Sequence, residues 1–216
     1  MDSGYAPDLL LDAYAAGVFP MAESRDAKGV FWMDPHQRGI FELDRFHISR
    51  SLARLIRRET LEIRLDSRFG DVVAACAERP ETWISHRLEA LYRAVHRAGH
   101  AHSVEVWENG ALVGGVFGIA LGGAFFGESM FSRRPNASKV ALAYLVDRLR
   151  EGGFTLFDTQ FLTPHLASLG AVEIPRAEYR RRLTRALEQP ADFHRQGAVP
   201  RGQSVLQRNT QTSWRA

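Results

Sequence analysis

The sequence predicts an α+β fold in which a mainly antiparallel sheet is flanked by helices. Asn109-Gly110 and Gly122-Gly123 each separate two apolar runs, and such dipeptides are typical of hairpin turns because tight turns need positive φ. The three runs that they join span residues 103–107, 112–121 and 124–131. Helical and strand patterns alternate after this meander, so helices are expected to pack on the sheet.

Residues 1–60 contain short elements and are expected to form a small N-terminal domain. Apolar residues at helical spacing predict two helices in this segment, and Ser49 is the expected N-cap of the second. The expected elements are a helix over residues 7–16, strands over 31–33 and 39–43, and a helix over 49–58. Residues 18–21 are expected to form an apolar loop.

Residues 61–188 are expected to form the main domain, and residues 189–216 a polar C-terminal tail that is partly mobile. Before the meander, the expected elements are a strand over 61–65 and helices over 66–78 and 87–98. After it, they are a helix over 136–151, a strand over 154–158, a short helix over 164–169, a short strand over 171–174 and a helix over 175–187. This order is similar to that of Gcn5-related N-acyltransferases, a similarity that concerns the fold alone.

The composition favours a soluble cytoplasmic protein. The chain has 216 residues, with 28 Lys and Arg against 25 Asp and Glu, and its net charge of +3 does not by itself indicate a nucleic-acid partner. The lone cysteine, Cys76, can form no disulfide within the chain and suits a reducing cytosol. The acidic start does not fit a signal peptide, and no run approaches the roughly 20 apolar residues of a membrane span. We therefore expect no membrane partner.

Positive charge is concentrated in two places. Residues 45–58 carry five arginines and no acid, and Arg133, Arg134 and Lys139 flank the expected start of the helix over 136–151. Free backbone N–H groups at a helix N-terminus favour anions, so these residues either grip phosphates or form a solvated basic face. His100 and His102 are two residues apart with no nearby cysteine, and no zinc site is expected there.

Asp158 and Gln160 end an expected strand, and their spacing places both side chains on one face. Such a pair suits the positioning of an amine nucleophile beside an activated carbonyl; the alternative is a structural hydrogen bond at a strand end. Glu128 lies in the apolar run 125–131, where a carboxylate is costly unless it is paired. It either binds a cationic amine or forms a salt bridge with the basic residues at 133–139.

The helix over 136–151 presents Leu142, Leu145 and Leu149 on one face. Core packing is the default interpretation of such a stripe. The same leucines would form a pocket for an apolar side chain if this face borders a cavity.

Long motifs resemble bacterial leucyl/phenylalanyl-tRNA–protein transferases over about residues 14–182. They are Gly17–Pro20, His47–Ser51, Thr82–Ile84, Gly99–Trp107, Gly127–Ser132, Asn136–Lys139, Asp158–Gln160 and Ala167–Ala171 with Glu173–Arg176. One departure is Phe31-Trp32, since the family usually has a Trp-Trp pair there.

The resemblance implies an aminoacyltransferase that moves Leu or Phe, and Met less well, from aminoacyl-tRNA to the N-terminal Arg or Lys of an acceptor protein. The product carries a destabilising N-terminus that the N-degron pathway of protein degradation reads. Because an aminoacyl ester is already activated, the reaction needs no cofactor and no metal.

The resemblance also implies roles for individual residues. Asp158 and Gln160 form the catalytic pair, and Glu128 lies near the substrate amine. The side-chain pocket is lined by Val116, Phe125, Leu142, Leu145, Leu149 and Phe157. The tRNA is bound by Trp32 and Trp83 at its terminal adenosine and by Arg50, Arg54, Arg57, Arg58, Arg133, Arg134 and Lys139 along its acceptor stem.

Two other classes of function stay open at this point. An acyl-CoA N-acyltransferase needs a glycine-rich pyrophosphate loop before the helix, and residues 131–136 contain no glycine. A non-catalytic RNA-binding module would leave Glu128, Asp158 and Gln160 without a role.

Overall fold

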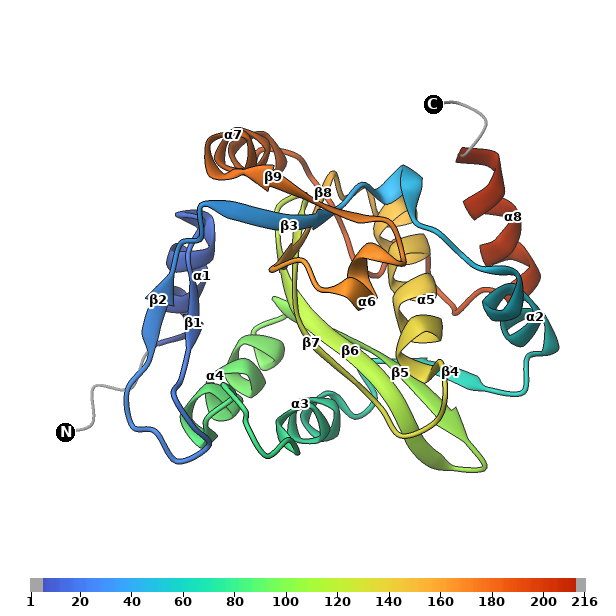
Figure 1. The fold of residues 1–216 in the computed structure, drawn as a ribbon, viewed down its shortest axis with the longest axis horizontal. Helices are drawn as coiled ribbons and strands as arrows, with labels where there is room; N and C mark the ends of the chain where they lie inside the picture. Colours follow the sequence, from blue (N-terminus) through green and yellow to red (C-terminus); the bar gives the residue numbers. More distant parts are fainter. Residues whose placement is uncertain (1–5, 213–216) are drawn as a thin grey trace.

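A seven-stranded sheet organises the fold in the computed structural model, which describes residues 6–212 (Figure 1). Its strands, in spatial order, are β4 (Glu62–Leu65), β5 (Ala101–Glu108), β6 (Ala111–Leu121), β7 (Ala124–Ser132), β8 (Leu156–Gln160), β3 (Gln37–Phe41) and β9 (Ala171–Pro175). Neighbours pair antiparallel, except that β7 and β8 run parallel. The expected α+β class is confirmed.

The predicted meander is confirmed as β5, β6 and β7. Asn109 and Gly110 connect the first hairpin at φ of 51° and 77°, and positive φ at both central residues is what a type I′ turn requires. Side chains along β6 alternate between two hydrophobic cores, since Val116 belongs to one core and Phe117 to the other. The sheet is therefore buried on both faces.

Helices cover the two faces (Figure 1). α5 (Ala137–Gly152) packs on one face of β5, β6 and β7, and α3 (Phe69–Ala77) and α4 (His86–Arg97) lie on the other. α1 (Pro7–Ala15) and α7 (Arg176–Leu187) extend the second layer, where α1 contacts α4 and α7. Short α6 (Pro164–Ala167) connects β8 to β9.

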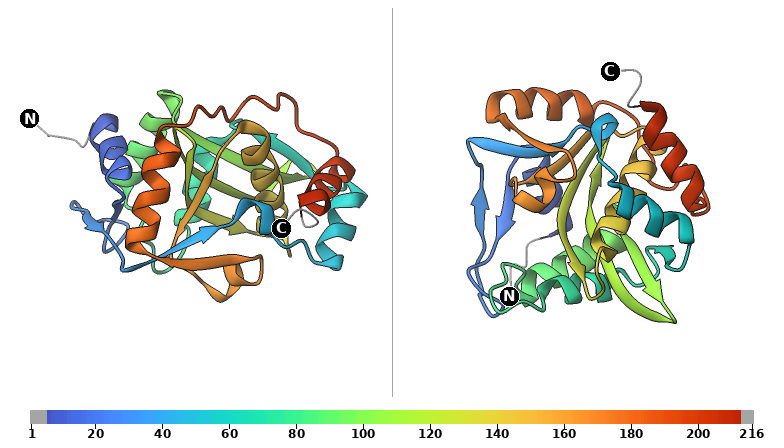
Figure 2. Two further views of the ribbon diagram at one scale, coloured as in Figure 1. Left: turned by 90° about the horizontal axis from the view of Figure 1, so that it is seen from above. Right: turned by 45° about the vertical axis from the view of Figure 1, so that its right-hand side comes forward.

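Three elements were not predicted. One is the 3₁₀ turn Leu43–Arg45, which begins where the expected strand over 39–43 should end, because β3 stops at Phe41. β1 (Phe19–Met21), which was expected to be a loop, pairs with β2 (Phe31–Met33). Three residues are too few to show a strand pattern of their own. α8 (Gly202–Thr212) forms in the expected polar tail, where Val205 and Leu206 are buried. Figure 2 shows α8 beside α2 (Arg50–Arg58), and α8 also contacts α5 and the 3₁₀ turn Leu43–Arg45. Residues 213–216 of the predicted tail lie outside the described residues.

Strand β3 connects the N-terminal segment to the main sheet. It lies between β8 and β9, with Gly39 opposite both Gln160 and Glu173. The proposed division into residues 1–60, 61–188 and 189–216 thus crosses a shared sheet and stays a prediction. None of the described helices combines the length and the apolar character that a membrane crossing requires.

Candidate functional site

The candidate site lies where β7 and β8 stop pairing. Their parallel register ends at Phe126 opposite Asp158, so Glu128 and Gln160 each follow two residues beyond the last pair. Strand β7 contains a bulge at Glu128, because Phe117 pairs with Ser129 while its neighbour Gly118 pairs with Gly127. A bulge redirects the side chain of the extra residue and is common beside functional sites.

Strand β8 is irregular at the equivalent point. Gly39 pairs with Gln160 and Ile40 with Asp158, which leaves Thr159 without a β3 partner in the register, and Gln160 has a φ of 65°. Gly39 is required for this close approach, since a Cβ there would lie 2.7 Å from the backbone carbon of Phe161. Two irregular strand ends therefore aim Glu128 and Gln160 at each other.

A pocket of about 210 Å³ opens at this point. Most of its wall is apolar, formed by Val116, Met130, Leu142, Phe157, Phe161 and Leu166. Glu128, Gln160, Arg79 and Trp83 also line it. The pocket thus combines room for an apolar side chain with a few convergent polar groups, as small-molecule sites commonly do.

Glu128 is the buried acid of this pocket. Its Oε2 accepts a hydrogen bond from the Tyr92 hydroxyl at 2.7 Å, and its Oε1 accepts one from Gln160 Nε2 at 3.0 Å. Burial raises the pKa of Glu128 to about 7, against the opposing effect of the Tyr14, Tyr92 and Gln160 dipoles. The carboxyl group therefore changes its charge near neutral pH.

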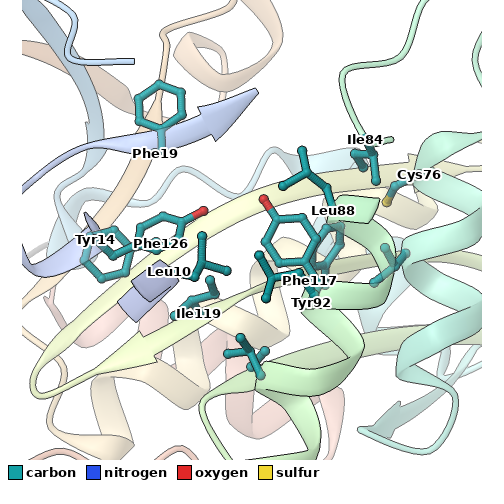
Figure 3. Close-up of a cluster of buried hydrophobic side chains, with 14 of the residues drawn as sticks. Leu10, Tyr14, Phe19, Cys76, Ile84, Leu88, Tyr92, Phe117, Ile119 and Phe126 are labelled. Atoms are coloured by element: carbon teal, nitrogen blue, oxygen red, sulfur yellow. The ribbon is translucent and has the colours of Figure 1, made fainter. Parts of the chain in front are cut away.

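Two tyrosines flank Glu128 from different helices. Tyr14 comes from α1 and Tyr92 from α4, and Figure 3 shows their hydroxyl oxygens directed toward the same gap. Burial first, and the Glu128 charge second, raise the pKa of both phenols well above the ordinary value. Both hydroxyls therefore stay protonated. The Tyr92 hydroxyl donates to Glu128, whereas the Tyr14 hydroxyl is buried without a hydrogen-bond partner among the described residues.

Asp158 lies beneath the pocket and does not line it. Its carboxylate is fully buried and accepts hydrogen bonds from Arg38 Nε at 2.9 Å and Nη2 at 2.6 Å, and from the Tyr179 hydroxyl at 2.7 Å. The Arg38 guanidinium also lies over the rings of Phe19 and Tyr179, at 4.5 and 4.3 Å from their centroids. Asp158 Oδ1 then accepts from the backbone N–H of Gln160 at 2.8 Å. The buried ion pair thereby fixes the main chain of Gln160.

The expected pocket residues divide into two groups. Val116, Leu142 and Phe157 line the pocket, whereas Phe125, Leu145 and Leu149 are at most 1% exposed within the core beside α5. Trp83 lines the pocket, but Trp32 lies on β2, 38% exposed and outside the lining.

The basic residues that were predicted to bind tRNA do not line the pocket. Arg50, Arg54, Arg57 and Arg58 are exposed on α2. Arg133 pairs with Glu78 at 2.6 Å, and Arg134 pairs with Glu108 at 2.7 Å. The alternative in which Glu128 pairs with Arg133, Arg134 or Lys139 is not observed among the described residues, because the Glu128 oxygens accept from Tyr92 and Gln160.

Sequence reasoning missed Arg38, Tyr14, Tyr92 and Tyr179. A charged residue within the short β3 pattern is the one local signal for Arg38. The tyrosines fit ordinary apolar helix positions, and only the folded chain shows that their hydroxyls reach the site.

Family models described as leucyl/phenylalanyl-tRNA protein transferase and as its N-terminal domain match residues 40–184 and 5–36. The chain is 63% identical over 207 residues to a leucyl/phenylalanyl-tRNA–protein transferase of Cereibacter sphaeroides, with 96% of this chain and 97% of that protein covered. The corresponding protein of Ruegeria pomeroyi is 61% identical over 209 residues, with coverages of 96% and 98%.

Among solved structures, FemX superposes with a TM-score of 0.53 at 13% identity, covering 78% of this chain and 66% of that one. At this identity the likeness concerns the fold alone.

Proposed function

Because the chain belongs to the leucyl/phenylalanyl-tRNA–protein transferase family, we propose that its new peptide bond forms in the pocket beside Glu128 and Gln160. The enzyme transfers an aminoacyl group from tRNA to a protein. In our proposal the aminoacyl group is Leu or Phe, and Met less well, and the acceptor is an N-terminal Arg or Lys. The product is an N-degron made in the cytoplasm.

The observation that carries this proposal is one pocket with an apolar wall and a buried acid–amide pair. The aminoacyl side chain packs against Val116, Leu142 and Phe157, and the reacting groups lie at Glu128 and Gln160. Such a wall discriminates weakly among flexible apolar side chains, because one methylene is worth only about 1–3 kcal/mol. Tolerance of Leu, Phe and Met follows from this.

The amine must lose a proton to attack. Its nitrogen bonds to the ester carbonyl carbon, the bond from that carbon to the ribose oxygen breaks, and the ribose oxygen ends as a hydroxyl. A terminal α-amino group has a pKa of about 7.7–8.0. Glu128, with its pKa near 7, can hold the ammonium form when ionised, and Gln160 positions the neutral amine. No step needs a cofactor or a metal.

Asp158 acts through Gln160 in this scheme. Its pair with Arg38 is buried, so it contributes by fixing the backbone of Gln160 instead of touching the substrate. Positioning the amine beside the ester carbonyl is a large part of catalysis when the ester is already activated.

The tRNA is proposed to lie across the pocket mouth. Trp83 lines the pocket and offers a ring on which the terminal adenosine can stack. The exposed arginines of α2, with Arg133, Arg134, Lys139 and Trp32, are the remaining proposed tRNA contacts. The diverging parallel pair in an otherwise antiparallel sheet supports a Gcn5-related architecture as the finer description of the fold.

Transfer of labelled Leu from Leu-tRNA to peptides that differ only in their first residue tests the function. We expect labelling of a peptide that begins with Arg and none of one that begins with Ala. Binding of Leu-tRNA without transfer to either peptide would favour an RNA-binding module. Transfer from an acyl-CoA, without Leu-tRNA binding, would favour the acyl-CoA class.

A further inference from the structure

Three potential metal ligands meet at one end of the sheet, outside the pocket. Asp66 follows β4, His102 lies in β5, and His194 belongs to the segment between α7 and α8. One ligand atom from each lies within 4.8 Å of the others. His102 Nδ1 is 2.8 Å from Asp66 Oδ2, and His194 Nε2 is 3.4 Å from the same oxygen.

Two of the three separations are close to those of a tetrahedral zinc site, and the third, between the two imidazoles, is at most 4.8 Å. Zn²⁺ binds imidazole nitrogen and carboxylate oxygen at roughly 2.0–2.2 Å, which places neighbouring ligand atoms of a tetrahedron about 3.3–3.6 Å apart. The pair at 3.4 Å already fits, and the pair at 2.8 Å has to open by about half an ångström. Neutral imidazole and carboxylate are also ligands that zinc accepts.

The surrounding structure holds the ligands in place. Asp66 Oδ1 accepts a hydrogen bond from the backbone N–H of Ser103 at 2.6 Å, which leaves Oδ2 to face the two rings. The His102 ring stacks on Phe193 with 4.2 Å between centroids. Supporting contacts that fix ligand orientation are a recurrent feature of metal sites.

The segment that carries His194 is anchored by α5. Arg148 Nη1 donates to the Phe193 carbonyl at 2.9 Å, and Nη2 donates to the Gly197 carbonyl at 3.0 Å. These contacts place His194 at the mouth of the cluster, with its side chain 59% exposed and open to solvent ions, while the His102 side chain is 8% exposed. An ion can therefore enter the site past His194, while His102 forms its partly buried inner end.

We propose that Asp66, His102 and His194 bind a zinc-type divalent ion that fastens the C-terminal segment to the sheet. The sequence did not predict this site. Its spacing pairs His102 only with His100, whereas the partners of His102 in the fold lie 36 and 92 residues away along the chain. A water molecule completes the coordination in this proposal. The site is structural, independent of the transfer reaction, and shares no residue with the pocket.

The test is titration of the metal-free, tag-free full chain with Zn²⁺ by calorimetry and with Co²⁺ by visible absorption. We expect one ion per chain, a tetrahedral Co²⁺ spectrum and a melting temperature that rises with Zn²⁺. His194→Ala and Asp66→Asn should each weaken binding by at least about tenfold and abolish the rise. Asn suits the φ of 53° at position 66 and keeps an acceptor for Ser103.

His100→Ala is the matched control, because His100 lies beside His102 in the same surface hollow but outside the cluster. Its binding and its melting shift should equal those of the wild type. The proposal is overturned if the wild type binds no Co²⁺ in tetrahedral geometry. It is equally overturned if His194→Ala and His100→Ala bind Zn²⁺ alike, since binding would then be adventitious.

Discussion

Burial turns Glu128 into a group that titrates near neutral pH. An exposed glutamate is fully ionised there, whereas the enclosed position of Glu128 raises its pKa to about 7. The carboxylate form survives because Tyr92 and Gln160 donate hydrogen bonds to it. A perturbed acid in a pocket is a common mark of a functional site, and here its physical cause is desolvation.

Glu128 should make stability depend on pH. Because its pKa is raised on folding, its stabilising contribution is complete below about pH 4.5 and is lost as pH rises through about 7. The shift corresponds to about 3 kcal/mol between those limits. Glu128→Gln, which has no proton to lose, should therefore gain stability relative to the wild type from about pH 4.5 to about pH 8.

Urea denaturation of both proteins across this pH range measures the difference. A difference that stays constant with pH would show that Glu128 does not titrate in this window.

Removing one partner of the Arg38–Asp158 pair should destabilise the protein strongly, whereas neutralising both partners should destabilise it much less. Arg38→Met leaves the Asp158 charge buried without a partner, so we expect a loss of about 3–5 kcal/mol in the free energy of unfolding. Adding Asp158→Asn should recover most of that loss. Arg180→Met, at an exposed pair with Asp34, is the control and should cost less than about 1 kcal/mol. Losses that simply add in the double variant would contradict this account.

The leucines along one face of helix α5 contribute both to the core and to the wall of the pocket. Leu142 lines the pocket, while Leu145 and Leu149 are 1% and 0% exposed in the core. Leu145 and Leu149 follow Leu142 by about one and two helical turns. One helix therefore supplies a residue that contacts substrate, in our proposal, and residues that only pack in the core.

Substitutions along α5 should separate specificity from stability. Leu142→Ala enlarges the pocket, and we expect the ratio of Phe to Leu transfer to rise several-fold. Leu149→Ala should instead cost about 2–5 kcal/mol of stability and leave that ratio unchanged. Competition between Phe-tRNA and Leu-tRNA, with melting curves for each variant, measures both. Equal effects on the ratio would argue against Leu142 as a pocket residue.

Local patterns predicted the elements better than the contacts between them. The hairpin at Asn109-Gly110 and the amphipathic helices carry strong signals of their own, and both were found. β1 depends on pairing with β2, and α8 depends on α2 and α5 far along the chain, so the residues of β1 and α8 alone did not predict them. Glu128, Asp158 and Gln160 could be predicted as site residues, because polar groups in apolar strands are costly unless they are paired or functional. Arg38 could not be predicted in this way, because its partner Asp158 lies 120 residues away along the chain.

At the scale of the whole molecule, the sheet collects the site from distant parts of the chain. The N-terminal helix supplies Tyr14, β3 supplies Arg38, the meander supplies Glu128, and β8 supplies Gln160. Helix α2, whose exposed arginines do not line the pocket, lies beside α8 (Figure 2). In our proposal, the exposed arginines of α2 bind the body of the tRNA and the pocket holds its reactive end, so the two tasks fall to separate surfaces.

Binding of tRNA should weaken as salt rises, because phosphate contacts release counterions. If Arg54 and Arg58 contact phosphates, Arg54→Gln with Arg58→Gln should reduce the slope of log affinity against log salt by about 0.7–0.9 per lost contact. Arg97→Gln, an exposed charge on α4, is the control and should leave the slope unchanged. An unaltered slope in the double variant would remove α2 from the interface.

The most direct test of the pocket is single-turnover transfer of Leu from saturating Leu-tRNA to an Arg-initiated peptide by Gln160→Gly. Glycine adopts the φ of 65° at this position without strain, so the substitution removes the amide and spares the turn. We predict a fall in the transfer rate of about 10²-fold or more, with Leu-tRNA still bound. A rate equal to that of the wild type would contradict the assignment of peptide-bond formation to this pocket.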